Sequence, residues 1–468
     1  MVWNEEKIHE LVIKQRDYFN LGETLSIDFR VKMLRRLESG IKKYENQLIE
    51  ALEKDLARNK VEAFLTDVGD VYMEINETIS HIRKWAKPET HFSGLLCFPS
   101  ITTKVYKMPY GVSLIISPFN FPIYLSFAPL VQAISGGNTA IIKASSKSPN
   151  CTQVMMDLIN EFFDEKYIKV VDGGHDVADM LLNERVDKIF YTGSPKVGRH
   201  VMECASKNLT SVALELGGET GNWCIVRKDA DLKDAARKIA FFKVLNSGQI
   251  CININQVAVA KEVSNDFLKC LKEEYIRQIG SDPLNNNEYP RLINKAAYEK
   301  CSKEALEYKD RIIFGGKGDE ESFKFEPTII YPVDINESIV NHELFSPLLP
   351  IVEYDDDKVE DLLNTIKERE HGLALYVFTK DIPWANKVMS TMQYGGGCIN
   401  EVCVHLMVKG VPFNGTGHSG MGAYHGVWGF REFTHPQTVL KGSSKFNLPL
   451  REHPFTEKKF NLIKKFER

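Results

Sequence analysis

The apolar run Val112-Ser-Leu-Ile-Ile116 stops at once at Ser117-Pro118. A short apolar run bounded by a turn is typical of a strand that is buried on both faces of a parallel sheet. A helix-like stretch from Pro122 to Ser135 follows and stops at Gly136-Gly137, and Asn138 to Ile142 is a second apolar run. The region therefore predicts a strand–helix–strand unit.

The same alternation continues to residue 216. Helical patterns are expected over 151–163, 176–182 and 196–207, and strands over 168–171, 188–191 and 211–216. This indicates an α/β fold with a doubly wound, mostly parallel sheet, in which ligands bind beyond the carboxyl ends of the strands. After Gly217-Gly218 a second α/β series runs to residue 400 and predicts a second sheet.

The flanking regions have other patterns. Residues 5–85 read as amphipathic helices, with Leu34, Leu37 and Ile41 on one face. Pro99 to Lys107 alternates like an exposed strand and lies outside the α/β pattern, so we expect a protruding ribbon that contacts a partner subunit.

Composition excludes several classes of protein. The chain has 468 residues, which corresponds to about three domains. Its net charge of -4 argues against a nucleic-acid partner held by phosphate contacts. No apolar run reaches the roughly 18 residues of a membrane span, and the polar N-terminus does not read as a signal peptide. The nine cysteines show neither C-x-x-C pairs nor zinc-ligand spacing, which predicts reduced thiols in the cytoplasm and no metal site.

One cysteine stands in a special place. In Asn246-Ser-Gly-Gln-Ile-Cys251 the thiol follows a helical pattern and precedes a β-rich run. A thiol at such a turn can face a cleft and act as a nucleophile. The alternative is a small buried hydrophobic residue.

Two other strand ends carry polar groups suited to catalysis. Asn120 follows the strand that ends at Ser117-Pro118, and its amide could donate to an oxyanion or cap the next helix. Glu215 lies in the apolar strand end Leu214-Glu-Leu216. A buried carboxyl group has a raised pKa and suits a general base, unless it pairs with an Arg or Lys.

Three further stretches could hold a nucleotide. Lys143 could donate to a ribose hydroxyl or snorkel at the surface. The turn Tyr191-Thr-Gly-Ser-Pro-Lys-Val-Gly198 places free N–H groups where a pyrophosphate could bind, or it is an ordinary loop. Glu343, in His342-Glu-Leu-Phe-Ser-Pro347, could hold ribose hydroxyls or be a solvated loop residue.

Taken together and in this order, these motifs resemble the NAD(P)-dependent aldehyde dehydrogenase family over nearly the whole chain. The run 412–425 and Phe455-Thr-Glu-Lys-Lys459 are similar to its class 3 branch, which acts on fatty and aromatic aldehydes. The resemblance implies that Cys251 attacks the aldehyde, that Asn120 and the Cys251 N–H hold the oxyanion, and that Glu215 activates water to hydrolyse the thioester.

The resemblance also implies cofactor contacts and an architecture. NAD or NADP would be bound by residues from several loops, namely Lys143, Ser146, Gly193, Ser194, Gly198, Glu343 and Phe345. Residues 1–87 and 108–216 would form the cofactor-binding domain and 217–410 the catalytic domain. Residues 88–107 and 411–468 would form oligomerisation and bridging segments and a C-terminal arm, in a homodimer.

Three positions depart from the family pattern. Ser146, followed by Lys147, stands where NAD-preferring members often carry a Glu, so we expect NADP to be tolerated or preferred. Glu219 replaces the usual Lys after Gly217-Gly218, and its role is open. Ile250 replaces the usual Thr before the nucleophile and favours an apolar substrate.

Two other functions remain open at this stage. The acyl group could pass to coenzyme A instead of water, although such relatives tend to lack the Glu at position 215. The chain could also be a non-catalytic binding or structural protein on the same fold, against which the joint presence of Cys251, Asn120 and Glu215 argues.

Overall fold

The predicted alternation builds a six-stranded sheet in the computed structural model, which describes residues 2–467. The strand order is β17-β7-β6-β3-β4-β5, and every strand is parallel to its neighbour except β17. The strands are β3 (Val112–Ile116), β4 (Thr139–Lys143), β5 (Ile168–Val171), β6 (Lys188–Gly193), β7 (Ser211–Leu216) and β17 (Gly420–Met421). The doubly wound fold expected from the sequence is confirmed.

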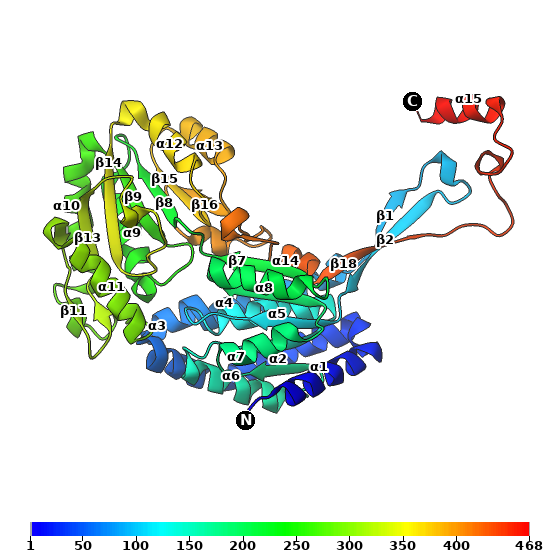
Figure 1. The fold of residues 1–468 in the computed structure, drawn as a ribbon, viewed down its shortest axis with the longest axis horizontal. Coiled ribbons are helices and arrows are strands. Elements are labelled where there is room, and N and C mark those ends of the chain that lie inside the picture. Colours follow the sequence, from blue (N-terminus) through cyan, green and yellow to red (C-terminus); the bar gives the residue numbers. More distant parts are fainter. Residues whose placement is uncertain (1, 468) are drawn as a thin grey trace.

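Helices cover both faces of this sheet (Figure 1). They are α1 (Glu5–Asn20), α2 (Ile27–Leu56), α4 (Gly69–Trp85), α5 (Tyr124–Gly136), α6 (Pro149–Phe162), α7 (His175–Asn183), α8 (Pro195–Ser206) and α14 (Gly426–Glu432). All thirteen residues of α5 are buried because it lies between the sheet and a layer of α2, α4 and α14. The amphipathic face predicted for α2 is buried as expected.

A seven-stranded sheet forms the second lobe, in the order β10-β13-β14-β9-β8-β15-β16, parallel except for the edge strand β10. Its strands are β8 (Asn222–Val226), β9 (Ile254–Ala260), β10 (Ile312–Phe314), β13 (Thr328–Val333), β14 (Leu348–Tyr354), β15 (Ala374–Phe378) and β16 (Gly396–Ile399). The accompanying helices are α9 (Leu232–Val244), α10 (Ser264–Ile279), α11 (Lys295–Glu307), α12 (Val359–Lys367) and α13 (Ile382–Thr391), with a small pair β11 (Gly318–Asp319) and β12 (Lys324–Phe325).

An arm extends away from the two lobes (Figure 1). It contains the antiparallel sheet β1-β2-β18, made of β1 (Glu89–Phe92), β2 (Thr102–Pro109) and β18 (Thr434–Leu440), and ends in α15 (Glu457–Phe466). The protruding strand expected near residues 99–107 is therefore present. The chain between the second lobe and β18 returns to the first lobe, where β17 pairs with β7 and α14 packs on α4 and α5.

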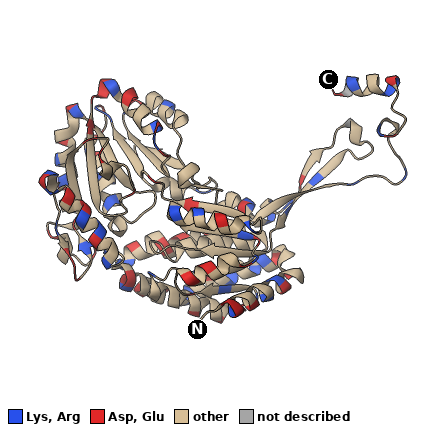
Figure 2. Cartoon of the chain, viewed as in Figure 1, with Lys and Arg blue, Asp and Glu red and all other residues tan. Residues whose placement is uncertain are grey.

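Charges of both signs are interspersed over the outer helices (Figure 2). Within residues 2–467 no helix is long and apolar enough to cross a membrane. In the same part of the chain no group of three or more His, Cys, Asp or Glu side chains is placed to hold a metal ion.

Candidate active site

The nucleophile turn, residues 246–251, joins α9 to β9 through an unusual backbone. Asn246, Ser247 and Gly248 have φ values of 48°, 51° and 77°, three left-handed residues in a row. Such a conformation costs free energy at non-glycine positions and persists only where the surroundings enforce it. Glycine is required at 248 because a Cβ there would lie 2.2 Å from the Ser346 carbonyl oxygen. The turn leaves Cys251 half-buried, just before β9.

Hydrogen bonds hold this turn from behind. The Asn246 amide nitrogen Nδ2 donates to the carbonyls of Asn120 and Gln249 at 2.9 and 3.0 Å, and its Oδ1 accepts from Arg58 Nε at 3.0 Å. The Asn246 backbone N–H donates to Glu62 Oε1 at 2.7 Å. Asn246 is buried, and these hydrogen bonds satisfy its polar groups. They therefore stabilise the strained backbone of the turn.

Arg58 is the centre of this network, although its side chain has no exposure to solvent. Its Nη1 donates to Asp67 Oδ2 at 2.7 Å, and its guanidinium lies 4.5 Å from the centre of the Phe121 ring. The other Asp67 oxygen accepts the backbone N–H groups of Ile123 and Tyr124 at 3.0 and 2.6 Å. Burial raises the pKa of Asp67 to about 6, against the opposing charge of Arg58.

Asn120 faces the nucleophile turn. Its Nδ2 donates to the Gln249 carbonyl at 3.1 Å, and the residue is buried. Since α5 begins only at Tyr124 and has no side-chain cap, the helix-capping alternative for Asn120 is wrong. A carboxamide carries two N–H donors, so one is still available to an oxyanion near Cys251.

Glu215 projects from the carboxyl end of β7 and is buried. Neither carboxylate oxygen has a hydrogen-bond partner among the described residues, so the structural ion pair considered for it is absent there. Burial, with a smaller contribution from Glu432, raises the pKa of Glu215 well above its ordinary value. A carboxyl group of this kind binds a proton readily at neutral pH.

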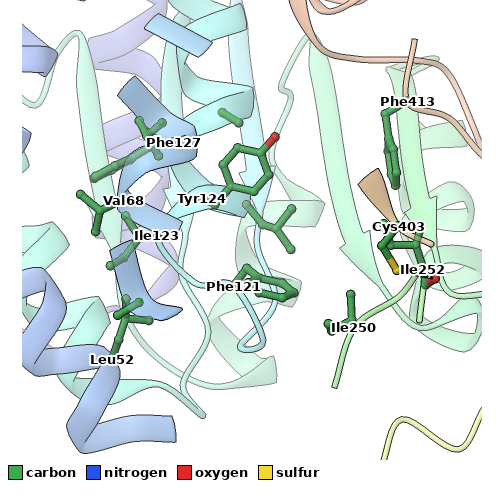
Figure 3. Close-up of a cluster of buried hydrophobic side chains, with 14 of the residues drawn as sticks. Leu52, Val68, Phe121, Ile123, Tyr124, Phe127, Ile250, Ile252, Cys403 and Phe413 are labelled. Carbon is green, nitrogen blue, oxygen red and sulfur yellow. Dashed lines mark hydrogen bonds between the residues drawn. The ribbon is translucent and has the colours of Figure 1, made fainter. Parts of the chain in front are cut away.

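Cys251 and Glu215 line one cavity of about 210 Å³ whose walls are almost entirely apolar. Figure 3 shows Phe121 and Tyr124 on one side and Ile250, Ile252, Cys403 and Phe413 on the other. Burial, followed by the nearby carboxylates of Glu343 and Glu215, raises the pKa of the Cys251 thiol to about 12. In this state the thiol is protonated at neutral pH, and attack requires a base.

Lys143 is the last residue of β4. Lys143 is 4% exposed, so it is not a snorkelling surface lysine. Its Nζ donates to the carbonyls of Ala144 and Gly173 at 2.8 and 2.6 Å, and burial lowers its pKa to about 8. Ser146 and Lys147 are exposed. The Lys147 ammonium lies 5.2 Å from the centre of the Phe119 ring and has no ion-pair partner among residues 2–467.

The junction of β6 and α8 contains the three small residues expected at a pyrophosphate. Gly193 ends β6, and Ser194 caps α8 by accepting from the Val197 N–H at 3.4 Å. Gly198 packs on β7, where a Cβ would lie 2.9 Å from Leu216 Cδ2. The N–H groups of the first helical turn thus lie at the carboxyl edge of the sheet.

Glu343 approaches the same edge from the second lobe. A Cβ on Gly217 would lie 2.1 Å from Glu343 Oε1, so only glycine leaves room for this carboxylate. Burial raises the pKa of Glu343 to about 7, which does not fit a solvated loop residue. Phe345 has a φ of 54° and packs edge-on against Phe119, with ring centroids 5.9 Å apart.

These residues fit a dinucleotide. The Glu343 carboxylate makes no hydrogen bond within the described chain, as expected of a group that accepts hydrogen bonds from ribose hydroxyls. The N-terminus of α8 and Lys143 lie along the same carboxyl edge of the sheet. Beside it Glu219 pairs with Arg199, so the negative charge that replaces the usual lysine is locally compensated.

A family model described as the aldehyde dehydrogenase family matches residues 2–439. The chain belongs to this family. It is 36% identical to the 4,4'-diaponeurosporen-aldehyde dehydrogenase of Staphylococcus aureus, over 99% of this chain and 98% of that protein. It is 35% identical to the dimeric NADP-preferring aldehyde dehydrogenase of Canis lupus familiaris, over 93% of this chain and 94% of that protein.

The solved structure of Staphylococcus aureus AldH in a substrate-bound state has the same fold, with a TM-score of 0.95, 35% identity, and coverage of 98% of this chain and 99% of that chain. The protein is an NAD(P)-dependent aldehyde dehydrogenase that oxidises an aldehyde. Both the family and the fold predicted from the sequence are confirmed.

Sequence reasoning missed the buried polar groups behind the site. Arg58 and Asp67 were read only as part of an amphipathic helical region. A charged side chain near the end of a helix is ordinarily exposed to solvent. The sequence around Arg58 and Asp67 gives no sign that the two side chains form a buried ion pair. Only the packing of the N-terminal helices against the nucleophile turn brings Arg58, Asp67 and Asn246 together.

Proposed function

We propose that Cys251 is the nucleophile, Glu215 the general base and Asn120 an oxyanion donor. The observation that carries this assignment is that both oxygens of Glu215 are buried and unpartnered in the cavity that Cys251 also lines. A buried polar group without a partner is rare and calls for a ligand or a catalytic role.

In the proposed reaction, Glu215 takes the thiol proton as the sulfur of Cys251 bonds to the aldehyde carbon. The resulting oxyanion accepts hydrogen bonds from Asn120 Nδ2 and the Cys251 N–H. NAD(P)⁺, when bound, supplies the hydride acceptor that converts the thiohemiacetal to a thioester. Glu215 releases the thiol proton to solvent and, as a carboxylate again, removes a proton from the water that attacks the thioester. The carboxylic acid leaves as the C–S bond breaks, and the departing thiolate takes the proton from Glu215, which restores the thiol.

The substrate class follows from the cavity walls. An apolar cavity favours medium- or long-chain aliphatic or aromatic aldehydes, because water is displaced from apolar surface on both partners. Ile250, which lines the cavity next to the nucleophile, adds apolar surface where a threonine would place a hydroxyl.

For the cofactor, Lys143 and Ser146 would bind the adenosine ribose, Gly193, Ser194 and Gly198 the pyrophosphate, and Glu343 and Phe345 the nicotinamide ribose. NADP would be accepted or preferred because the exposed Lys147 lacks a carboxylate partner within residues 2–467. Ser146→Glu should lower kcat/KM with NADP by about 10- to 100-fold and leave NAD nearly unchanged. A wild-type preference for NAD of ~100-fold or more would contradict this proposal.

The chain would divide into three functional parts. We assign cofactor binding to residues 1–87 and 108–216, catalysis to residues 217–410, and subunit contacts to the arm. A homodimer partner would then contact β1, β2 and β18. A reducing cytoplasmic location fits the nine cysteines, all of which are free. Light scattering tests the dimer.

Replacing the nucleophile is the direct test. Cys251→Ala should abolish aldehyde-dependent NAD(P)H formation, whereas Cys270→Ala, which removes a half-exposed thiol elsewhere, should not change it. Full activity of Cys251→Ala would overturn the assignment and favour a non-catalytic role for the site. Formation of acyl-CoA faster than free acid would favour the coenzyme A alternative.

A further inference from the structure

The cavity that Cys251 and Glu215 share contains a second carboxylate. Asp70 lies in the first turn of α4 and lines the cavity among apolar side chains. A π-helical turn, Phe64–Val68, directly precedes α4, and it turns Leu65 and Thr66 toward the same cavity. Wide turns of this kind recur at functional sites because they redirect side chains without breaking a helix.

Asp70 differs from its two neighbouring acids, Asp67 and Glu74. Asp67 is saturated by Arg58 and two backbone N–H groups. Glu74 accepts from Gln132 and from the Gly426 N–H. Asp70 is half-buried and makes neither a hydrogen bond nor an ion pair within residues 2–467. It also borders a second, more polar cavity, but on the Cys251 side it faces apolar surface, where a carboxylate without a partner is costly.

Three other polar side chains of the cavity have partners within the chain. Thr66 donates to the Glu62 carbonyl, Tyr124 is within 3.3 Å of His425 Nε2, and the Cys403 thiol donates to the Ile252 carbonyl. Glu215 serves the reaction. The buried Thr192 hydroxyl has no partner among the described residues, but it can donate as well as accept a hydrogen bond. Apart from Glu215, Asp70 is the carboxylate of the cavity that the described chain leaves for a ligand.

We propose that Asp70 is a specificity-determining residue that selects aldehydes with an apolar body and a hydrogen-bond donor, a hydroxyl or a protonated amine, at a distance from the reacting carbonyl. This inference rests on the proposed function of the Cys251 site. A site built to accept a hydrogen bond rejects the analogue that lacks the donor, because its own polar group is then left unpaired. Burial, and after it the nearby acids Asp67 and Glu74, raises the pKa of Asp70 to about 7. Both the carboxylate and the carboxylic acid can accept a hydrogen bond, so Asp70 can bind a donor in either protonation state.

Matched aldehydes test the proposal. 4-(Hydroxymethyl)benzaldehyde and 4-ethylbenzaldehyde differ by a hydroxyl in place of a methyl group, and 8-hydroxyoctanal and nonanal repeat the comparison over a longer reach. For at least one pair, kcat/KM of the wild-type enzyme should be about tenfold or more higher for the donor-bearing aldehyde. The 4-(aminomethyl) analogue distinguishes a protonated amine from a hydroxyl.

Variants locate the effect at Asp70. Asp70→Leu should reverse the preference, since it removes the acceptor and adds apolar surface, while Asp70→Asn should retain part of it. Glu77→Gln removes another half-buried carboxylate of the same helix. Glu77 shares a second cavity with Asp70 but does not line the Cys251 cavity, so this variant should leave the preference unchanged. Equal losses for both members of each pair in Asp70→Leu, or no wild-type preference in either pair, would overturn the proposal.

Binding separates this inference from the proposed function. Calorimetry with the unreactive alcohols 1,4-benzenedimethanol and 4-ethylbenzyl alcohol reports on the cavity without any turnover. If wild type oxidises alkanals through Cys251 but shows no preference for donors, only the role of Asp70 fails. If Cys251→Ala retains activity while the diol binds about tenfold tighter in an Asp70-dependent way, only the proposed mechanism fails.

Discussion

The two sides of the nucleophile turn are built in opposite ways. Behind the turn, Asn246, Arg58 and Asp67 are buried and fully hydrogen-bonded. On the cavity side, the buried Glu215 and the half-buried Asp70 are carboxylates with no hydrogen-bond partner in the described residues. The hydrogen bonds behind the turn hold its backbone in place. The carboxylates on the cavity side can therefore stay without hydrogen-bond partners until a substrate binds.

The largest expected effect comes from the cavity side. Glu215→Gln should lower steady-state turnover by up to about 10⁴-fold, because an amide cannot take a proton from the thiol or from water. Stopped-flow absorbance of NAD(P)H, with mass spectrometry for an acyl-enzyme, shows which step fails. Glu219→Gln, at an exposed and locally paired carboxylate, is the control. Unchanged turnover in Glu215→Gln would show that Glu215 is not the general base.

The thiol itself gives a pH test. A pKa of about 12 instead of 9.0 makes the thiolate roughly a thousandfold scarcer at neutral pH. Because the pKa is raised, the thiolate fraction increases with pH until about 12. Alkylation of Cys251 by iodoacetamide in the cofactor-free enzyme should therefore be slow at pH 7 and rise about tenfold per pH unit. Cys97, in the arm, is the reference in the same sample, and a rate that levels off near pH 7 would contradict a buried, base-dependent thiol.

The scaffold side is tested by Arg58→Met. Removing one member of a buried ion pair leaves Asp67 uncompensated, so the free energy of unfolding should fall by about 3–5 kcal/mol. Arg35→Met breaks an exposed pair with Glu38 and should cost about 0–1 kcal/mol. Denaturant titration measures both variants. Equal losses would mean that the Arg58 network does not hold the turn.

The smallest of these effects lies between the two sides, at Asn120. Asn120→Ala should lower kcat by about 10²–10³-fold, the range for loss of one oxyanion donor. KM should change little, since the bond forms mainly in the transition state. Asn208→Ala, at an exposed amide, is the control. A change in KM alone would assign Asn120 to the scaffold, through its bond to Gln249, rather than to the reaction.

Local patterns predicted most elements of both sheets because a buried strand must be apolar and must stop at a turn. Strands β3, β5 and β7 were predicted with the bounds observed. Helix α10 was missed even though Phe267, Leu271 and Tyr275 recur at helical spacing on its buried face. The strands β17 and β18 were missed because each is defined by its partner, and neither has an apolar run of its own.

Residue type and local spacing were enough to predict the alternating α/β architecture, the family, and the candidates Cys251, Asn120 and Glu215. Only the tertiary structure decided that Arg58 and Asp67 support the nucleophile turn and that Asp70 shares a cavity with Cys251. The physical reason is that burial and hydrogen-bond satisfaction depend on groups far apart in the chain. The same carboxylate is solvated, paired or left for a ligand according to what the fold places beside it.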